Sequence, residues 1–165
     1  MIRRTTFAAL VMLSAVTVSA CNRGSDPKPD VPPEADIPFS KHGTLDFLRD
    51  GKPLLTIDIE IADNDSSRMR GMMQRSSFPE KSGMLFIFPF ERLQSFWMAN
   101  TPIALDILFV NSSKEIVYIH RYTRPLSPES VESDIPSQYV LELPAGFCDT
   151  YGIVESDRLT WTRQP

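Results

Sequence analysis

Two carboxylates interrupt apolar runs of the sequence, where a charged side chain is costly to bury. Asp106 lies within the apolar residues 103–110, and Glu142 lies between two leucines. A carboxylate in such surroundings needs a group that donates hydrogen bonds to it. Arg70 is a candidate, because its guanidinium group can bind a carboxylate through two parallel hydrogen bonds.

Together with Trp97 and Asn100, these residues predict a polar ligand pocket on a β-sheet scaffold. Arg70 and Asn100 would donate hydrogen bonds to a ligand, and Trp97 would form an aromatic wall. Asp106 and Glu142 would accept hydrogen bonds, or would act as general acid and base in glycoside hydrolysis. Two structural alternatives remain open: the same side chains could tie the ends of loops to the sheet, or the two acids could lie on a solvated face.

Three methionines, Met69, Met72 and Met73, recur at helical spacing and predict the buried face of a short helix over residues 67–74. Thioether groups can also bind Cu(I), which is the alternative interpretation of this cluster. Neither histidine has a second histidine or a cysteine at ligand spacing. We therefore expect no metal site and no cofactor, and we expect Cys148 to be a buried thiol.

The start of the chain has the pattern of an export signal. Arg3 and Arg4 precede an apolar run over residues 7–18, which is too short to span a bilayer as a helix. The next residues, VSAC, resemble a bacterial lipobox that ends at Cys21. This resemblance implies cleavage after the signal peptide (residues 1–20) and acylation of Cys21, which would anchor the protein in a membrane. We expect a lipoprotein outside the cytoplasm, on the periplasmic face if the source is Gram-negative.

Residues 21–40 are predicted to form a tether, because five of the 14 prolines of the chain lie there without apolar periodicity. The formal net charge of the whole chain is −4, which argues against a basic surface for nucleic acid. The partners expected are therefore the membrane, through the lipid anchor, and a small molecule or envelope ligand, but not nucleic acid. The oligomeric state is left open.

Residues 41–165 are predicted to form one β-rich domain, since 165 residues leave room for a single domain with a tail. Residues 44–49 and 53–61 alternate in polarity around Asp50-Gly51, which predicts a hairpin. Further strands are expected at residues 84–88, 95–98, 103–110, 116–122, 139–143 and 158–162, with a loop at 125–137 and a helical turn between Gly146 and Gly152. This pattern favours an α+β, mainly antiparallel β fold: a compact β-sandwich or barrel-like domain with one or two short helices.

Several short motifs in a fixed order resemble an uncharacterised bacterial and archaeal family, domain of unknown function 192. They are RGMM from Arg70, GMLF from Gly83, FWMANT from Phe96, LDILF from Leu105 and YVLELPAG from Tyr139. The similarity extends over residues 57–160. It implies a compact, mostly β fold, and it implies no particular reaction.

The residues and the export signal together predict a lipid-anchored module outside the cytoplasm that binds a small ligand or a cell-envelope partner. The alternative is a hydrolase that acts on envelope carbohydrate through Asp106 and Glu142. The two hypotheses differ in geometry, because only the hydrolase needs both carboxyl groups to face one substrate.

Overall fold

The structure, a computed structural model, describes residues 36–164 of the chain. The predicted signal peptide (residues 1–20), the predicted lipidation site Cys21 and most of the predicted tether (residues 21–40) lie outside the described residues. Neither of the helices found in the described part is long and apolar enough to cross a bilayer.

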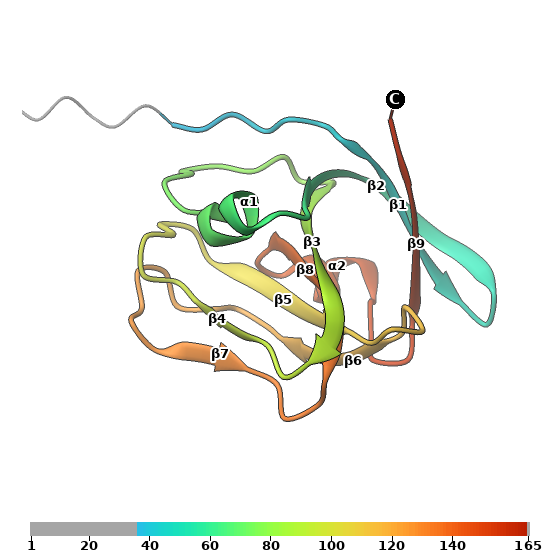
Figure 1. Cartoon of the computed structure of the whole chain (residues 1–165). Coiled ribbons are helices and arrows are strands. Elements are labelled where there is room, and N and C mark those ends of the chain that lie inside the picture. The colour runs from blue at the N-terminus through green and yellow to red at the C-terminus, as the bar shows by residue number, and fades with distance from the viewer. Residues whose placement is uncertain (1–35, 165) are drawn as a thin grey trace, which may run out of the picture. The chain divides into compact units, whose positions relative to one another are not determined.

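The described residues form strands β1 to β9 and two short helices, α1 and α2 (Figure 1). The strands are β1 (Gly43–Arg49), β2 (Lys52–Ala62), β3 (Ser82–Arg92), β4 (Ser95–Trp97), β5 (Leu105–Val110), β6 (Ile116–His120), β7 (Ser130–Glu132), β8 (Ser137–Pro144) and β9 (Arg158–Arg163). The helices are α1 (Asp65–Arg70) and α2 (Phe147–Tyr151).

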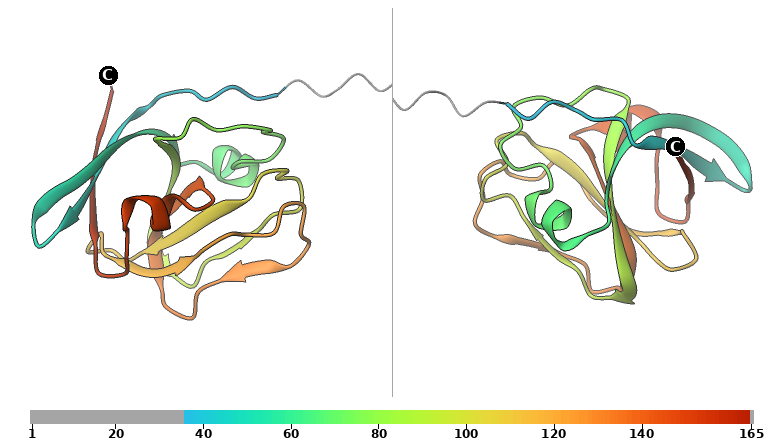
Figure 2. Two further views of the ribbon diagram at one scale, coloured as in Figure 1. Left: turned by 180° about the vertical axis from the view of Figure 1, so that it is seen from behind. Right: turned by 45° about the horizontal axis from the view of Figure 1, so that its top comes forward.

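Seven of these strands form one curled sheet in the order β6-β5-β8-β3-β2-β1-β9, which makes half of a barrel (Figures 1 and 2). The predicted α+β, β-rich fold with short helices is confirmed, in its barrel-like form. All neighbouring strands are antiparallel except β2 and β3, which are parallel. A parallel pair needs a crossover connection, which α1 and the loop after it provide. The remaining strands, β4 and β7, form a separate two-stranded ribbon.

The predicted hairpin is formed by β1 and β2, with Asp50 and Gly51 at its turn. Both turn residues have positive φ angles, 50° and 74°, which an Asp-Gly pair tolerates in a two-residue turn. The other edge of β1 pairs with β9, so that the hairpin is held between the rest of the sheet and the last strand.

The two edge strands of the sheet, β6 and β9, approach each other at one end. Glu115, just before β6, forms an isolated bridge with Arg158 at the start of β9. The backbone amide of Leu159 also donates to the carbonyl of Lys114, at 2.8 Å. The half-barrel is therefore closed at this end by main-chain hydrogen bonds.

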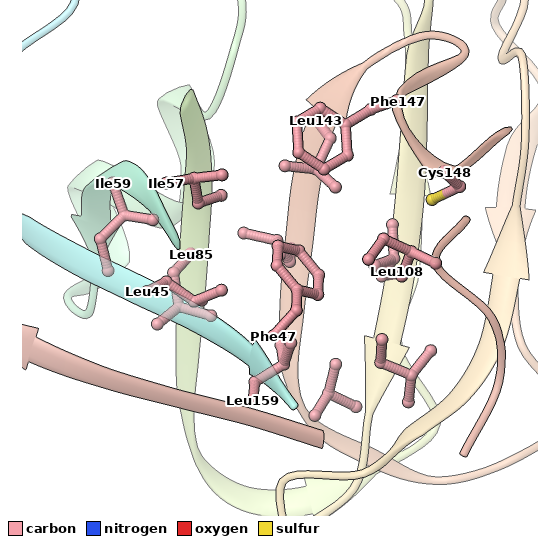
Figure 3. Close-up of a cluster of buried hydrophobic side chains, with 14 of the residues drawn as sticks. Leu45, Phe47, Ile57, Ile59, Leu85, Leu108, Leu143, Phe147, Cys148 and Leu159 are labelled. Atoms are coloured by element: carbon pink, nitrogen blue, oxygen red, sulfur yellow. The ribbon is translucent and has the colours of Figure 1, made fainter. Parts of the chain in front are cut away.

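The sheet buries hydrophobic side chains on both of its faces. On the inner face, Leu45 and Phe47 of β1 join Leu108 of β5 and Phe147 of α2 in one cluster (Figure 3). Because β1 and β5 are separated by three strands, this face must be concave. A second cluster lies on the outer face, where the segment after α1 and the β4–β7 ribbon cover β3, β5 and β8.

Helix α1 differs from the prediction of a helix over residues 67–74. It begins after Asn64, whose side chain accepts a hydrogen bond from the backbone amide of Ser67, and it is followed by Gly71 with φ 49°. No residue of α1 is buried, and Met69 is 78% exposed, so its assignment to a buried helical face is wrong. Strand β7 lies inside the predicted loop, residues 125–137, where no strand was expected.

Residues 36–40, the end of the predicted tether, contact the loop after α1. The Asp36 carboxylate accepts hydrogen bonds from the backbone amide and the hydroxyl of Ser76, at 2.8 and 2.7 Å. The ring of Phe39 packs edge-on against Phe78, with 5.1 Å between the ring centroids. Among the described residues, the contacts of the domain therefore extend into the predicted tether.

Candidate functional site

A pocket of about 690 Å³ opens on the outer side of the sheet. The segment around α1, strand β3 and strand β4 form its walls, and a side chain from β8 reaches it from the sheet. The residues that line it include Met69, Arg70, Met72, Met73, Phe86, Phe88, Arg92, Phe96, Trp97 and Glu142. The pocket thus combines an apolar, largely aromatic wall with a few charged groups, which is the usual composition of a small-molecule site.

The structure brings three of the five predicted ligand-binding residues together. Arg70, Trp97 and Glu142 all line the pocket. Asn100 does not line it, although its neighbour Thr101 does; the amide group of Asn100 instead donates to the sulfur of Met73, at 3.9 Å. Asp106 is not among the lining residues.

Asp106 is fully buried, and backbone amide groups are its hydrogen-bond donors. The amides of Tyr122, Gly146 and Cys148 donate to its two oxygens at 3.0, 3.2 and 3.0 Å. Tyr122 lies just after β6, and Gly146 and Cys148 lie at the start of α2. The predicted pairing with Arg70 is therefore wrong: Arg70 is exposed, and Asp106 ties the start of α2 to the sheet. The solvated outer face considered for this acid is also excluded by its burial.

The two carboxylates lie on opposite faces of the sheet. Asp106 is opposite Leu143 in the register of β5 and β8, and Glu142 is opposite Ile107. Residues that face each other across two strands share one side of a sheet, and adjacent residues of a strand point to opposite sides. Asp106 and Glu142 are therefore not placed across one substrate, as a paired acid and base would have to be.

Glu142 is a buried carboxyl group at the inner end of the pocket. Only 5% of the residue is exposed, and its Oε2 atom has no hydrogen-bond partner among the described residues. Burial raises the pKa of Glu142 from 4.5 to about 8, although the positive charge of Arg75 opposes this rise. Glu142 is therefore mostly a neutral carboxylic acid at pH 7.

A buried ion pair lies beside Glu142 on the same face of the sheet. Met84 of β3 is flanked in register by Glu60 of β2 and by Glu142 of β8, so that the three side chains form a row. The guanidinium group of Arg75 binds both carboxylate oxygens of Glu60, at 3.0 and 2.7 Å, and both residues are at least 95% buried. The sequence does not predict this ion pair, because Glu60 lies on the polar face of a strand in which polar and apolar residues alternate.

The mouth of the pocket is formed by cationic and exposed apolar side chains. Arg68 is held by the carbonyl oxygen of Ile87 and by Asp65, at 2.8 and 2.7 Å. Arg70 and Arg92 are exposed, and Arg92 lies over the ring of Phe88, 5.9 Å from its centroid. Beside them, three apolar side chains that line the pocket are largely in solvent: Met69, Leu93 and Trp97.

Comparisons with known proteins identify relatives, but no activity. The family model DUF192, described as Uncharacterized ACR, matches residues 47–161. The UPF0127 protein PF1050 of Pyrococcus furiosus is 28% identical over 116 residues, which cover 66% of this chain and 90% of that protein. The resemblance seen in the sequence motifs is thereby confirmed.

Two solved structures share the fold. A protein from Sinorhizobium meliloti 1021, described as a candidate transcription regulator, has a TM-score of 0.70 and 32% identity, covering 77% of this chain and 98% of that chain. A protein of unknown function from Novosphingobium aromaticivorans DSM 12444 has a TM-score of 0.67 and 25% identity, covering 72% of this chain and 84% of that chain.

Proposed function

The chain belongs to the uncharacterised DUF192 family. From its pocket and from the lipobox in its sequence, we propose that it is a lipid-anchored module outside the cytoplasm that binds a small, largely apolar molecule. The observation that carries this proposal is the convergence of Arg70, Trp97 and Glu142 on one pocket. Its volume, about 690 Å³, falls within the range of typical small-molecule sites. The separation of Asp106 from Glu142 removes the reason to prefer a hydrolase with paired carboxylates.

Trp97 gives a direct test of ligand binding, because the chain has only one other tryptophan, Trp161. The test uses the fluorescent probe 8-anilinonaphthalene-1-sulfonate, whose emission rises in apolar surroundings. We expect saturable binding with energy transfer from Trp97 in the variant Trp161→Phe, and clearly weaker binding in Trp97→Ala. If Trp97→Ala and Arg70→Ala fold normally and bind the probe as tightly as the unchanged protein, the proposed pocket is wrong.

The lipid anchor is a separate part of the proposal, and its support is the lipobox that ends at Cys21. It predicts incorporation of labelled palmitate in cells, recovery of the protein in the membrane fraction, and accumulation of the precursor with globomycin. The variant Cys21→Ser is the matched control and should remain unlabelled. An unlabelled, freely soluble wild-type protein would refute the anchor without touching the pocket.

Cu(I) binding is a second candidate, since Met69, Met72 and Met73 all line the same pocket. Anaerobic titration should then show uptake of one Cu(I) per chain, with loss of uptake in the variant Met69→Leu. A role in transcription, which the description of the Sinorhizobium relative suggests, is not proposed, because a net charge of −4 opposes binding to the phosphates of DNA.

A further inference from the structure

We infer that the ligand of this pocket is an organic anion with an apolar body and a hydrogen-bond acceptor, such as a carbonyl oxygen, at its inner end. In this arrangement Glu142 donates a hydrogen bond to the acceptor, and the cationic mouth holds the anionic group. The inference rests on the proposed binding function and adds to it the chemical class of the ligand.

The inner end of the ligand is specified by Glu142. Its Oε2 atom is buried without a hydrogen-bond partner among the described residues, and its side chain lines the pocket. A polar atom left in this state costs free energy, which a ligand atom of the right kind would recover. Because the pKa of Glu142 is about 8, the group carries a proton at pH 7 and can donate it in a hydrogen bond.

Burial keeps Glu142 neutral against the opposing charge of Arg75, and the charged groups around the pocket leave an excess of positive charge at its mouth. They are Glu60 on β2, Arg75 in the loop after α1, Asp65, Arg68 and Arg70 on α1, and Arg92 on β3. The strand neighbours of Glu142, Met84 and Ile107, are uncharged. Glu60 neutralises Arg75, and Asp65 neutralises Arg68, as described above. The two remaining cations, Arg70 and Arg92, lie at the mouth and favour an anionic group there.

The body of the ligand would lie between aromatic side chains. Phe86 and Phe88 are at least 91% buried, and each packs against Phe96 with an interplanar angle of 86° or more. Trp97 is 60% exposed and extends this wall toward the mouth. A flat ring or a short aliphatic segment between the two polar ends suits such walls.

A matched pair of probes tests the acceptor at the inner end. 4-Acetylphenylacetate carries a carbonyl oxygen where 4-isopropylphenylacetate carries a methyl group, and the two anions are otherwise alike in shape. At pH 6.5 we expect the acetyl compound to displace the fluorescent sulfonate about tenfold more effectively, the effect of one well-formed hydrogen bond. Glu142→Gln should keep this preference, because its amide can donate, and Glu142→Leu should abolish or reverse it.

The pH dependence of the same preference identifies the donor. In the unchanged protein the advantage of the acetyl compound should fall as the pH rises through 8, since the ionised carboxylate cannot donate. In Glu142→Gln it should stay constant between pH 6 and 9. Glu142→Gln retains the size of the side chain, so it also serves if Glu142→Leu fails to fold.

Two outcomes would overturn the inference while leaving the binding function intact. One is equal affinity for the acetyl and isopropyl anions in a protein that still binds the sulfonate at Trp97. The other is preferred binding of 2-(4-isopropylphenyl)ethylamine, a cation, with an affinity that rises toward pH 8. Absence of sulfonate binding at Trp97 would instead contradict the proposed function itself.

Discussion

Asp106 and Glu142 lie one residue out of register on neighbouring strands, and their carboxyl groups point to opposite faces of the sheet. On the inner face, Asp106 receives three backbone amide hydrogen bonds and fixes the start of α2. On the outer face, Glu142 has an oxygen without a partner and borders a pocket. Both oxygens of Asp106 are thus hydrogen-bonded within the fold, whereas one oxygen of Glu142 is available to a ligand. Stability measurements can separate these two roles.

Replacing Asp106 by Asn should destabilise the domain by about 1–3 kcal/mol, because one buried backbone amide would then face a donor instead of an acceptor. The free energy of unfolding from urea titration measures this loss. Asp149→Asn is the matched control, since Asp149 is on the same short helix but its side chain is 54% exposed. An equal loss in the two variants would contradict the role assigned to Asp106.

Glu142 should make the stability of the protein fall as the pH rises from about 5 to 8. The folded protein keeps the proton of Glu142 up to a pKa of about 8, whereas the unfolded chain releases it near 4.5. Folding therefore binds a proton in this window, and the stability decreases by up to about 1.4 kcal/mol per pH unit.

The variant Glu142→Gln has no such proton, so its stability relative to the unchanged protein should increase with pH over the same window. Urea titrations at pH 5, 6.5 and 8 measure the difference. Glu129→Gln, at an exposed position, should show no trend. A constant difference between Glu142→Gln and the unchanged protein would show that the acid is ionised in the fold.

Arg75→Met should cost about 3–5 kcal/mol, because it leaves the buried carboxylate of Glu60 without its cation. Adding Glu60→Leu should recover much of the loss, since the apolar pair has no buried charge. The comparison is Arg163→Met, which breaks the more exposed pair with Asp63 and should cost less than about 1 kcal/mol. If the double variant is no more stable than Arg75→Met, the buried charge is not the cause of the loss.

Cys148 should be unreactive toward thiol reagents in the folded protein. The residue is fully buried, and both this burial and the negative charge of Asp106 raise the pKa of its thiol. In the variant Cys21→Ser, which has a single thiol, labelling should be slow in buffer and complete in urea. Rapid labelling without denaturant would point to a reactive thiol instead.

Local features of the chain are predictable from short stretches of sequence. The β1–β2 hairpin follows from alternating polarity around Asp50-Gly51, and the limits of α2 follow from Gly146 and Gly152, both with positive φ. These features depend on residues close together along the chain. Motifs rather than periodicity identified the family.

The predictions that were wrong concern features that depend on tertiary contacts. Met69 has the spacing of a buried helical residue, but α1 ends at Arg70. Met72 therefore lies in the loop after the helix, where it is buried, whereas Met69 lies on the helix and is exposed. Strand β7 has only three residues and exists because β4 pairs with it. Arg70 and Glu142 line one pocket although they come from α1 and β8, and no sequence spacing predicts that Arg70 shares a site with Glu142 and not with Asp106.

The pairing of β1 with β9 places residue 42 beside residue 164, where the backbone amide of Gln164 donates to the carbonyl of His42. A short linker could therefore join these two positions, and new termini could be opened at the turn of residues 111–114 between β5 and β6. Such a circular permutant would retain every strand pair of the sheet. Fusing residues 1–41 to the new amino terminus would place the proposed lipid anchor on another side of the domain, so that the orientation of the pocket relative to the anchor becomes an adjustable property.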